Sequence, residues 1–121
     1  MDIDVIYTCG GNTFTLVRLI KECGFGKEIK KYIKNGVIYI GRSAGTHLIT
    51  KNIKHVIPFD DNYIGLKNYN ALGILDGIVY CHYTEERKPY YEKSLKEQKY
   101  NTYKLTNDEV MIVDDNDIKI I

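Results

Sequence analysis

A run of four apolar residues, 37–40, leads without a break into the sequence Gly41-Arg42-Ser43-Ala44-Gly45. An uninterrupted apolar run of this kind is typical of a strand that is buried on both faces, as in a parallel sheet. The glycines on either side of Ser43 permit a tight turn, because small neighbours relieve the crowding around the serine. A helix-compatible stretch, 44–50, comes next. The segment therefore predicts a strand, a sharp turn and a helix.

The rest of the chain continues this alternation of strand and helix. Short runs of β-forming residues predict further strands, and apolar residues at helical spacing predict further helices. The order of these elements predicts an α/β fold in a single domain over residues 1–121. We expect a mainly parallel sheet flanked by helices, with an antiparallel hairpin at the C-terminus. The remaining predicted strands are 3–9, 74–80, 102–105, 109–113 and 118–121, and the remaining predicted helices are 13–23, 27–34 and 89–98.

The charge balance and the cysteines narrow the classes of function. The net charge is +1, with acids and bases spread along the chain, so there is no electrostatic reason to expect nucleic acid or a membrane as a partner. No apolar run approaches the roughly 18 residues that a membrane helix needs. Cys9, Cys23 and Cys81 show no metal-ligand spacing, so we expect no metal. Their odd number, without a signal sequence, favours the cytoplasm.

Ser43 is the candidate nucleophile, provided that the predicted turn lifts its hydroxyl above the sheet. The alternative is an ordinary strand-to-helix turn in which the serine caps the helix. A serine hydroxyl needs a general base. The candidate base is His82, which follows a predicted strand at the sheet edge where sites form in parallel α/β folds. His47, one helical turn past the serine, and His55, in a loop, are the alternatives.

Two further groups could complete a hydrolytic site. A carboxylate would hold the imidazole in the correct tautomer, and Asp60 and Asp61 lie in the loop between the candidate nucleophile and base. Adjacent acids in a turn are usually solvated, however, and spacing alone does not choose between them. Gly10-Gly11-Asn12 follows the first strand, and its amides could form half of an oxyanion hole with the amide of Ala44 as the other half.

Four segments together resemble the successive landmarks of the peptidase E (aspartyl dipeptidase) family of serine peptidases. They occur in the family's order and at similar separations, and the resemblance extends from about Asp4 to the C-terminus. It implies a fold similar to that of class I glutamine amidotransferases. It also implies hydrolysis of short peptides with an N-terminal aspartate, with no metal or organic cofactor. The segments are Cys9-Gly10-Gly11-Asn12-Thr13-Phe14, Tyr39-Ile40-Gly41-Arg42-Ser43-Ala44-Gly45, Asn70-Ala71-Leu72-Gly73 and Cys81-His82-Tyr83.

The resemblance assigns a role to each matching residue. Ser43 matches the family nucleophile, and His82 matches the family base. Asp60 falls on the aspartate of the family triad, with the following aspartate as the fallback. Gly11 and Ala44 match the oxyanion positions. The implied activity is therefore that of a serine dipeptidase with a small peptide as its substrate.

Three further expectations concern substrate binding and assembly. Arg87 could pair with a substrate carboxylate in a fork geometry, the alternative being a solvated arginine at a helix start. Cys9 stands where the family usually has glycine, which could crowd the oxyanion loop. Family chains also extend further on the N-terminal side, and missing strand–helix units would expose a strand edge and apolar faces. We therefore expect one of two outcomes. Either the chain forms a homo-oligomer, namely a dimer, that covers these surfaces, or its site is lost or altered. The alternatives to a peptidase are a non-catalytic binding or assembly module and an esterase.

Overall fold

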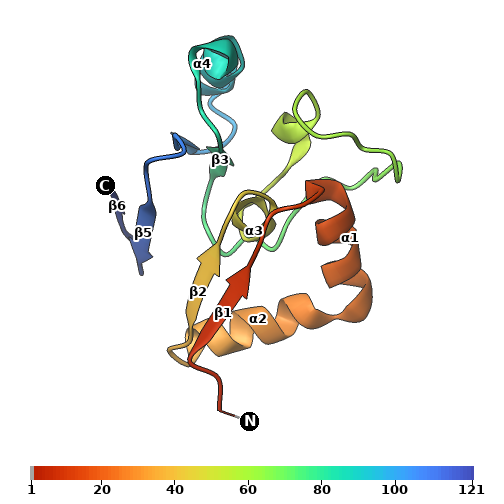
Figure 1. The fold of residues 1–121 in the computed structure, drawn as a ribbon, viewed down its shortest axis with the longest axis vertical. Coiled ribbons are helices and arrows are strands. Elements are labelled where there is room, and N and C mark those ends of the chain that lie inside the picture. The colour runs from red at the N-terminus through yellow and green to blue at the C-terminus, as the bar shows by residue number, and fades with distance from the viewer. Residues whose placement is uncertain (1) are drawn as a thin grey trace.

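The computed structural model describes residues 2–121 and has an α/β fold (Figure 1). Strands and helices alternate through the first half of the chain, and short strands dominate the C-terminal part. The helices are α1 (Thr13–Cys23), α2 (Phe25–Lys34), α3 (Ala44–Leu48) and α4 (Lys88–Glu97), with 3-10 turns η1 (Lys54–Val56) and η2 (Glu85–Arg87). The strands are β1 (Val5–Thr8), β2 (Ile38–Gly41), β3 (Ile78–Tyr80), β4 (Thr102–Lys104), β5 (Met111–Asp114) and β6 (Asp117–Ile120).

The first half of the chain forms the unit that leads into the serine turn. β1 and β2 pair in parallel, in a register that sets Val5 beside Ile38 and Thr8 beside Gly41. The connection between the strands is helical and begins at Asn12, whose side chain accepts a hydrogen bond from the amide of Thr15 at 3.0 Å. The two strands therefore end at the same edge, as the parallel arrangement predicted.

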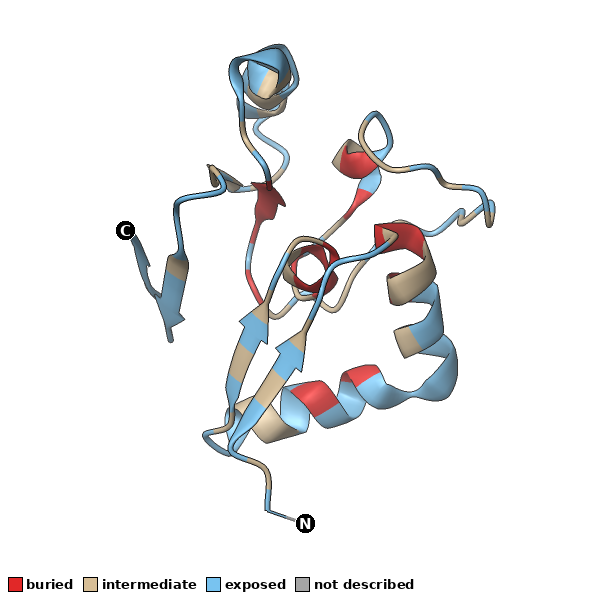
Figure 2. Cartoon of the chain, viewed as in Figure 1, coloured by how far each residue is buried: buried red, intermediate tan, exposed pale blue. Residues whose placement is uncertain are grey.

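One face of this strand pair is uncovered, which corrects the prediction of a strand buried on both faces. On the covered face, Ile6 and Tyr39 pack against the core. On the other face, Val5, Tyr7, Ile38 and Ile40 are 46–60% exposed (Figure 2). The run of apolar residues is present, but within residues 2–121 helices lie against only one side of it.

The main core lies behind the serine turn. Its buried side chains come from α1, α2, α3 and the region of η1, and Figure 2 shows α3 as a buried helix at the centre of the molecule. Each fully buried apolar side chain contributes about 1.5–3 kcal/mol relative to an exposed one. This packing fixes α3, and with it the serine that precedes the helix. The core residues are Phe14, Val17, Ile29, Leu48, Ile53 and Val56.

The second half of the chain carries the candidate base. β3 and β4 pair in parallel, with Ile78 beside Thr102 and Tyr80 beside Lys104. β5 and β6 form the antiparallel hairpin predicted at the C-terminus. β3 is buried throughout and packs with a second small core formed by Leu75, Val79 and Cys81. The end of β3 is therefore a rigid support for the residue that follows it.

The single, mainly parallel sheet that the sequence predicted is wrong in detail. The described residues form three separate pairs of strands, β1–β2, β3–β4 and β5–β6. The predicted strand 74–80 is strand only over its last three residues. The amide of Leu75 instead donates to the carbonyl of Ile49 at 2.8 Å, after α3, so the backbone of this segment is bonded to a loop rather than to a neighbouring strand.

Candidate active site

Ser43 has an unusual backbone conformation, with φ 54° and ψ −111°. A non-glycine residue adopts such a conformation only where its surroundings enforce it. The surroundings here are crowded: a Cβ atom on Gly41 would lie 2.6 Å from the carbonyl oxygen of Gly45, and one on Gly45 would overlap the carbonyl group of Thr8. The two flanking glycines are therefore required for the close approach of β1, β2 and α3 that holds the serine in place.

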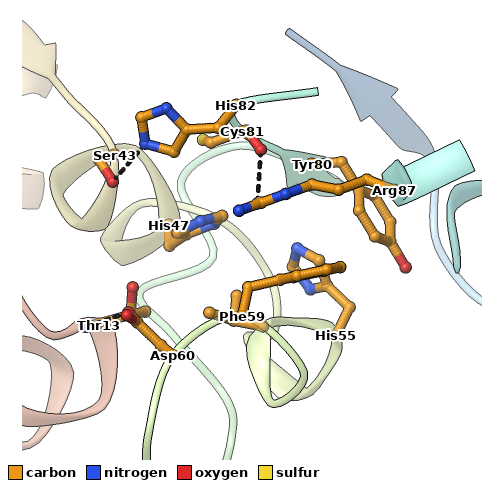
Figure 3. Close-up of a pocket in the computed structure, with 11 residues that line it drawn as sticks. Thr13, Ser43, His47, His55, Phe59, Asp60, Tyr80, Cys81, His82 and Arg87 are labelled. Atoms are coloured by element: carbon orange, nitrogen blue, oxygen red, sulfur yellow. Dashed lines mark hydrogen bonds between the residues drawn. The ribbon is translucent and has the colours of Figure 1, made fainter. Parts of the chain in front are cut away.

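The hydroxyl of Ser43 is hydrogen-bonded to His82, with 3.0 Å between Oγ and Nε2 (Figure 3). The other ring nitrogen of His82, Nδ1, lies 2.6 Å from Oδ1 of Asn107. An amide oxygen only accepts hydrogen bonds, so Nδ1 carries the proton and the lone pair of Nε2 faces the serine hydroxyl. The structure thus brings together the predicted nucleophile and base in the relation that proton transfer requires.

Asn107 was missed by the sequence prediction. It follows β4, which pairs in parallel with β3, and His82 follows β3. Because parallel neighbours end at the same edge of a sheet, residues after the two strands come together. The pairing of 102–105 with 74–80 would have pointed to Asn107, but the sequence alone does not show which strands are neighbours.

Asp60 lies in the same pocket but does not contact His82 as expected. Its Oδ2 atom accepts a hydrogen bond from the amide of Thr13 at 2.9 Å (Figure 3). The backbone carbonyl of Asp61 accepts a hydrogen bond from the side chain of Asn12 at 2.8 Å. Both aspartates therefore attach their loop to the start of α1. In this structure Nδ1 of His82 is hydrogen-bonded to Asn107 and not to Asp60, which was the predicted orienting group.

The expected oxyanion residues lie around the serine. A Cβ atom on Gly10 would be 3.4 Å from Cβ of Ser43, so the end of β1 passes directly beside the serine. Ala44 is the first residue of α3, where an amide has no acceptor within its own helix. Gly11 has a φ of 139°, and no hydrogen bond engages its amide among residues 2–121. Cys9 is exposed.

A cavity of about 50 Å³ lies beneath the serine and His82 (Figure 3). Its walls come from elements far apart in the sequence, namely α1, α3, η1, β3 and η2. Two of the residues that line it are His47 and His55, which the sequence suggested only as alternatives to His82 for the role of base. The spacing of four residues between Ser43 and His47 puts both on one side of a helical turn, which is the signal that could have placed His47 here.

These two histidines are neutral at physiological pH. The pKa of His47 is lowered to about 3 by burial, and further by the neighbouring His55, His82 and Arg87. The pKa of His55 is lowered to about 4 by burial, against which its hydrogen bond to the carbonyl of Val79 acts. Groups this weakly basic are poor acceptors for the proton of a serine, so His82 remains the candidate base.

Cys81 is the other potential nucleophile in the cavity. Burial raises the pKa of its thiol to about 11, against smaller opposing effects of Thr46 and Arg87. The thiolate is the reactive form of cysteine, and it is scarce at neutral pH when the pKa is so high. Ser43 therefore remains the candidate nucleophile of this cavity.

Arg87 lies across the cavity from the serine. Its Nη1 atom donates to the carbonyl of Cys81 at 2.9 Å, and its Cζ atom is 4.1 Å from the centre of the Phe59 ring. A guanidinium group has five N–H donors, and among the described residues this is the one hydrogen bond recorded for the Arg87 side chain. The side chain of Arg87 is half-buried and held in place by these two contacts, so it is not a freely solvated arginine. Its other N–H groups could donate to a ligand.

Across residues 2–121, no three His, Cys, Asp or Glu side chains are gathered closely enough to hold a metal ion. Over the same residues, every helix is too short or too polar to span a membrane.

Proteins of known sequence and structure resemble this chain. Lin0382, an uncharacterized peptidase of Listeria innocua, is 34% identical over 95% of this chain and 57% of its own length. Peptidase E of Citrobacter koseri is 30% identical over 81% of this chain and 42% of its own length. A crystal structure from Listeria monocytogenes, assigned to peptidase E, superposes with a TM-score of 0.84 and 32% identity, over 98% of this chain and 59% of that one.

The match covers most of this chain but only part of each relative. The chain spans about half the length of the curated relatives that it matches. Across that span, the sequence and the fold both agree with the relatives. The model of peptidase family S51 matches residues 1–121, which is the whole chain. The chain therefore belongs to peptidase family S51.

Proposed function

We propose that the protein is a serine-type peptidase that hydrolyses short peptides with an N-terminal aspartate. The observation that carries the proposal is the 3.0 Å hydrogen bond between Ser43 and His82, made by a serine held in a strained turn between a strand and a helix. This turn has the features of a nucleophile elbow. Membership of a peptidase family supports hydrolysis, and relatives named peptidase E support peptide bonds as the target.

In the first step, Oγ of Ser43 attacks the carbonyl carbon of the scissile bond, and Nε2 of His82 accepts the hydroxyl proton. The tetrahedral intermediate then collapses as the C–N bond breaks, and the proton passes from His82 to the leaving amine. Water, deprotonated by the same imidazole, then attacks the acyl-enzyme. As the bond between the acyl carbon and Oγ breaks, the imidazole returns this proton to Ser43, and the acid is released. Each step conserves the proton that moves between serine, imidazole and leaving group.

Asn107 takes the place of a carboxylate in this scheme. Its side-chain oxygen holds the proton on Nδ1 of His82, so that Nε2 stays free to act as the base. An amide oxygen, unlike a carboxylate, brings no negative charge to the imidazolium that forms. The orientation of the base is therefore retained, while part of the electrostatic stabilisation is absent.

We assign to the amides of Gly11 and Ala44 the stabilisation of the negative charge that develops on the substrate oxygen. Ala44 directly follows the serine, and Gly11 follows Gly10, which passes beside it. Preorganised amides stabilise a tetrahedral intermediate. Arg87 is assigned to a carboxylate of the substrate, because its guanidinium faces the cavity with free donors. The relation of the fold to class I glutamine amidotransferases is part of the same proposal.

Hydrolysis of an Asp-X dipeptide, followed by the appearance of the free C-terminal amino acid, tests the proposal. Ser43 and Ser94 are the two serines of the chain. Turnover is expected for the wild type and for Ser94→Ala, and a loss of at least 1,000-fold, on the order of the effect of removing a triad serine, for Ser43→Ala. Equal turnover by the two serine variants would exclude the mechanism. Folded wild-type protein without turnover would favour the non-catalytic module.

A further inference from the structure

The cavity beneath the serine has a floor that the catalytic scheme does not use. His47, from α3, and His55, from η1, stand with their ring centres 5.5 Å apart (Figure 3). Arg87 reaches in over the ring of Phe59 from the opposite wall. Three cationic or potentially cationic side chains thus meet within one small space, directly below the catalytic pair.

Both histidines have a buried nitrogen without a partner. Within residues 2–121, Nδ1 of His47 and Nδ1 of His55 are buried and make no hydrogen bond, and His47 as a whole is only 6% exposed. Leaving a buried polar group unpaired is unfavourable, because its lost hydration is not replaced by a hydrogen bond. A ligand group that pairs with these nitrogens would recover this free energy, so the floor is suited to a polar group and not to an apolar one.

The protonation of His55 follows from its one hydrogen bond. Its Nε2 atom lies 2.7 Å from the carbonyl oxygen of Val79, and a carbonyl only accepts, so Nε2 carries a proton. In the neutral ring, Nδ1 then carries no proton, and its lone pair can only accept a hydrogen bond. A carboxylate also has only lone pairs, so it can pair with this nitrogen only after His55 takes up a second proton.

Arg87 opposes protonation of the free imidazoles, and the negative charge of an entering anion offsets this and favours proton uptake. Arg87 supplies one fixed positive charge, and Asp60 supplies a negative charge that is already hydrogen-bonded to the amide of Thr13. His82 lies above the floor. Cys81 and Tyr80 line the same cavity, and because burial raises the pKa of both, they keep their protons at neutral pH. An entering anion is thus met by one guanidinium and two neutral imidazoles.

We infer that His47, His55 and Arg87 form a subsite for the carboxylate side chain of the substrate residue that contributes the scissile carbonyl. The carboxylate enters together with a proton, which one of the two imidazoles holds. The cavity of about 50 Å³ has room for a few water-sized groups, which suits a carboxylate and excludes a large side chain. This inference rests on the proposed peptidase function, and it adds the two histidines and a proton to the recognition of the acidic residue.

Proton uptake predicts how specificity changes with pH. The substrates are the p-nitroanilides of aspartate and asparagine, which have nearly the same shape and differ in charge. The ratio of kcat/KM for the aspartate substrate to that for the asparagine substrate is expected to rise as the pH falls from 8 to 6, by up to about tenfold per pH unit for one proton. Because the same nucleophile and base act on both substrates, any effect of pH on the reaction that they share cancels from the ratio.

Variants of the floor provide the second part of the test. In His55→Gln, the side-chain amide can still donate to the carbonyl of Val79 but cannot take up a proton, so the pH dependence of the ratio is expected to weaken or vanish. Lys54→Gln changes the exposed neighbouring residue and is expected to keep the wild-type dependence. A ratio that is flat with pH in the wild type, or a preference for asparagine at pH 6, would overturn the inference.

Calorimetry separates the failure of this inference from the failure of the proposed function. The probe is an Asp-X dipeptide binding to Ser43→Ala protein, measured in two buffers of different ionisation enthalpy. Uptake of close to one proton at pH 7 supports the subsite even if no substrate is turned over, and binding without proton uptake overturns it. Turnover of neutral substrates without binding of the acidic peptide would overturn the subsite and leave the peptidase intact.

Discussion

The orientation of His82 is the feature of the site that depends most directly on single residues. Ser43 and His82 could be predicted from the sequence, because each directly follows a predicted strand and the ends of parallel strands are where sites form. Asp60 could not be placed correctly, because its distance from His82 depends on the path of a loop without regular structure. The contact of Asn107 with Nδ1 requires the pairing of β3 with β4, which is a tertiary fact.

Substitutions at the two candidate orienting residues distinguish their roles. Asn107→Ala is expected to lower kcat by about 10- to 100-fold, part of the contribution of a positioned base, with little change in KM. Asp60→Asn keeps an oxygen that can accept from the amide of Thr13, so its effect on kcat is expected to stay within about threefold. Steady-state kinetics on the Asp-X dipeptide provides the measurement. A large loss for Asp60→Asn together with a small loss for Asn107→Ala would restore the aspartate as the orienting group.

At the scale of elements, local signals predicted β1, α1, α2, β2 and α3, because caps, glycines and helical spacing all lie within short windows. Burial was harder to predict. The apolar run of β2 predicts that both faces of the strand are buried. Burial of a face, however, depends on whether another helix or strand packs against it, and within residues 2–121 only one face of β2 is packed in this way. The position of His55 was also beyond the sequence, since η1 meets α3 only through the packing of Leu48, Ile53 and Val56.

The packing of α3 against η1 has a consequence for stability at low pH. The pKa of His47 is about 3 and that of His55 about 4 in the folded state, against about 6.5 in the unfolded chain. Below pH 6.5 the unfolded chain therefore binds protons that the folded protein does not, and stability that is present above pH 6.5 is lost as the pH falls toward 4. Lowering the pH from 7 to 5 is expected to reduce the free energy of unfolding by about 2 kcal/mol for each of the two histidines.

Urea unfolding at pH 7 and pH 5 measures this loss. Replacing one of the pair, as in His55→Gln, is expected to reduce the difference between the two pH values by about half. His82→Gln, which removes an exposed histidine, is the matched control. If His55→Gln unfolded with the same pH dependence as the wild type, burial of a neutral histidine would not be the source of the effect.

At the scale of the whole molecule, the main apolar surface that residues 2–121 leave uncovered is one face of the β1–β2 pair. Its side chains are apolar and lie in register across the two strands, with Val5 beside Ile38 and Tyr7 beside Ile40. Parallel strands are normally covered on both faces. We therefore expect a homodimer in which this face is buried.

Light scattering during gel filtration tests this expectation. The wild type is expected to elute with twice the mass of the chain, and Ile38→Lys to weaken the association by at least about tenfold, since burial of such a side chain is worth about 1.5–3 kcal/mol. Lys67→Glu changes an exposed residue outside this strand pair and serves as the control. A monomer at all concentrations, or a dimer unaffected by Ile38→Lys, would contradict the assignment of this face.

The reaction of the purified protein with a serine-directed fluorophosphonate, read as the mass of the intact chain, tests most directly whether Ser43 is activated by His82. One adduct is predicted for the wild type and for Ser94→Ala, none for Ser43→Ala, and labelling at least about tenfold slower for His82→Ala. An adduct that persists in Ser43→Ala, equal rates with and without His82, or a folded wild type that takes up no label would contradict the account.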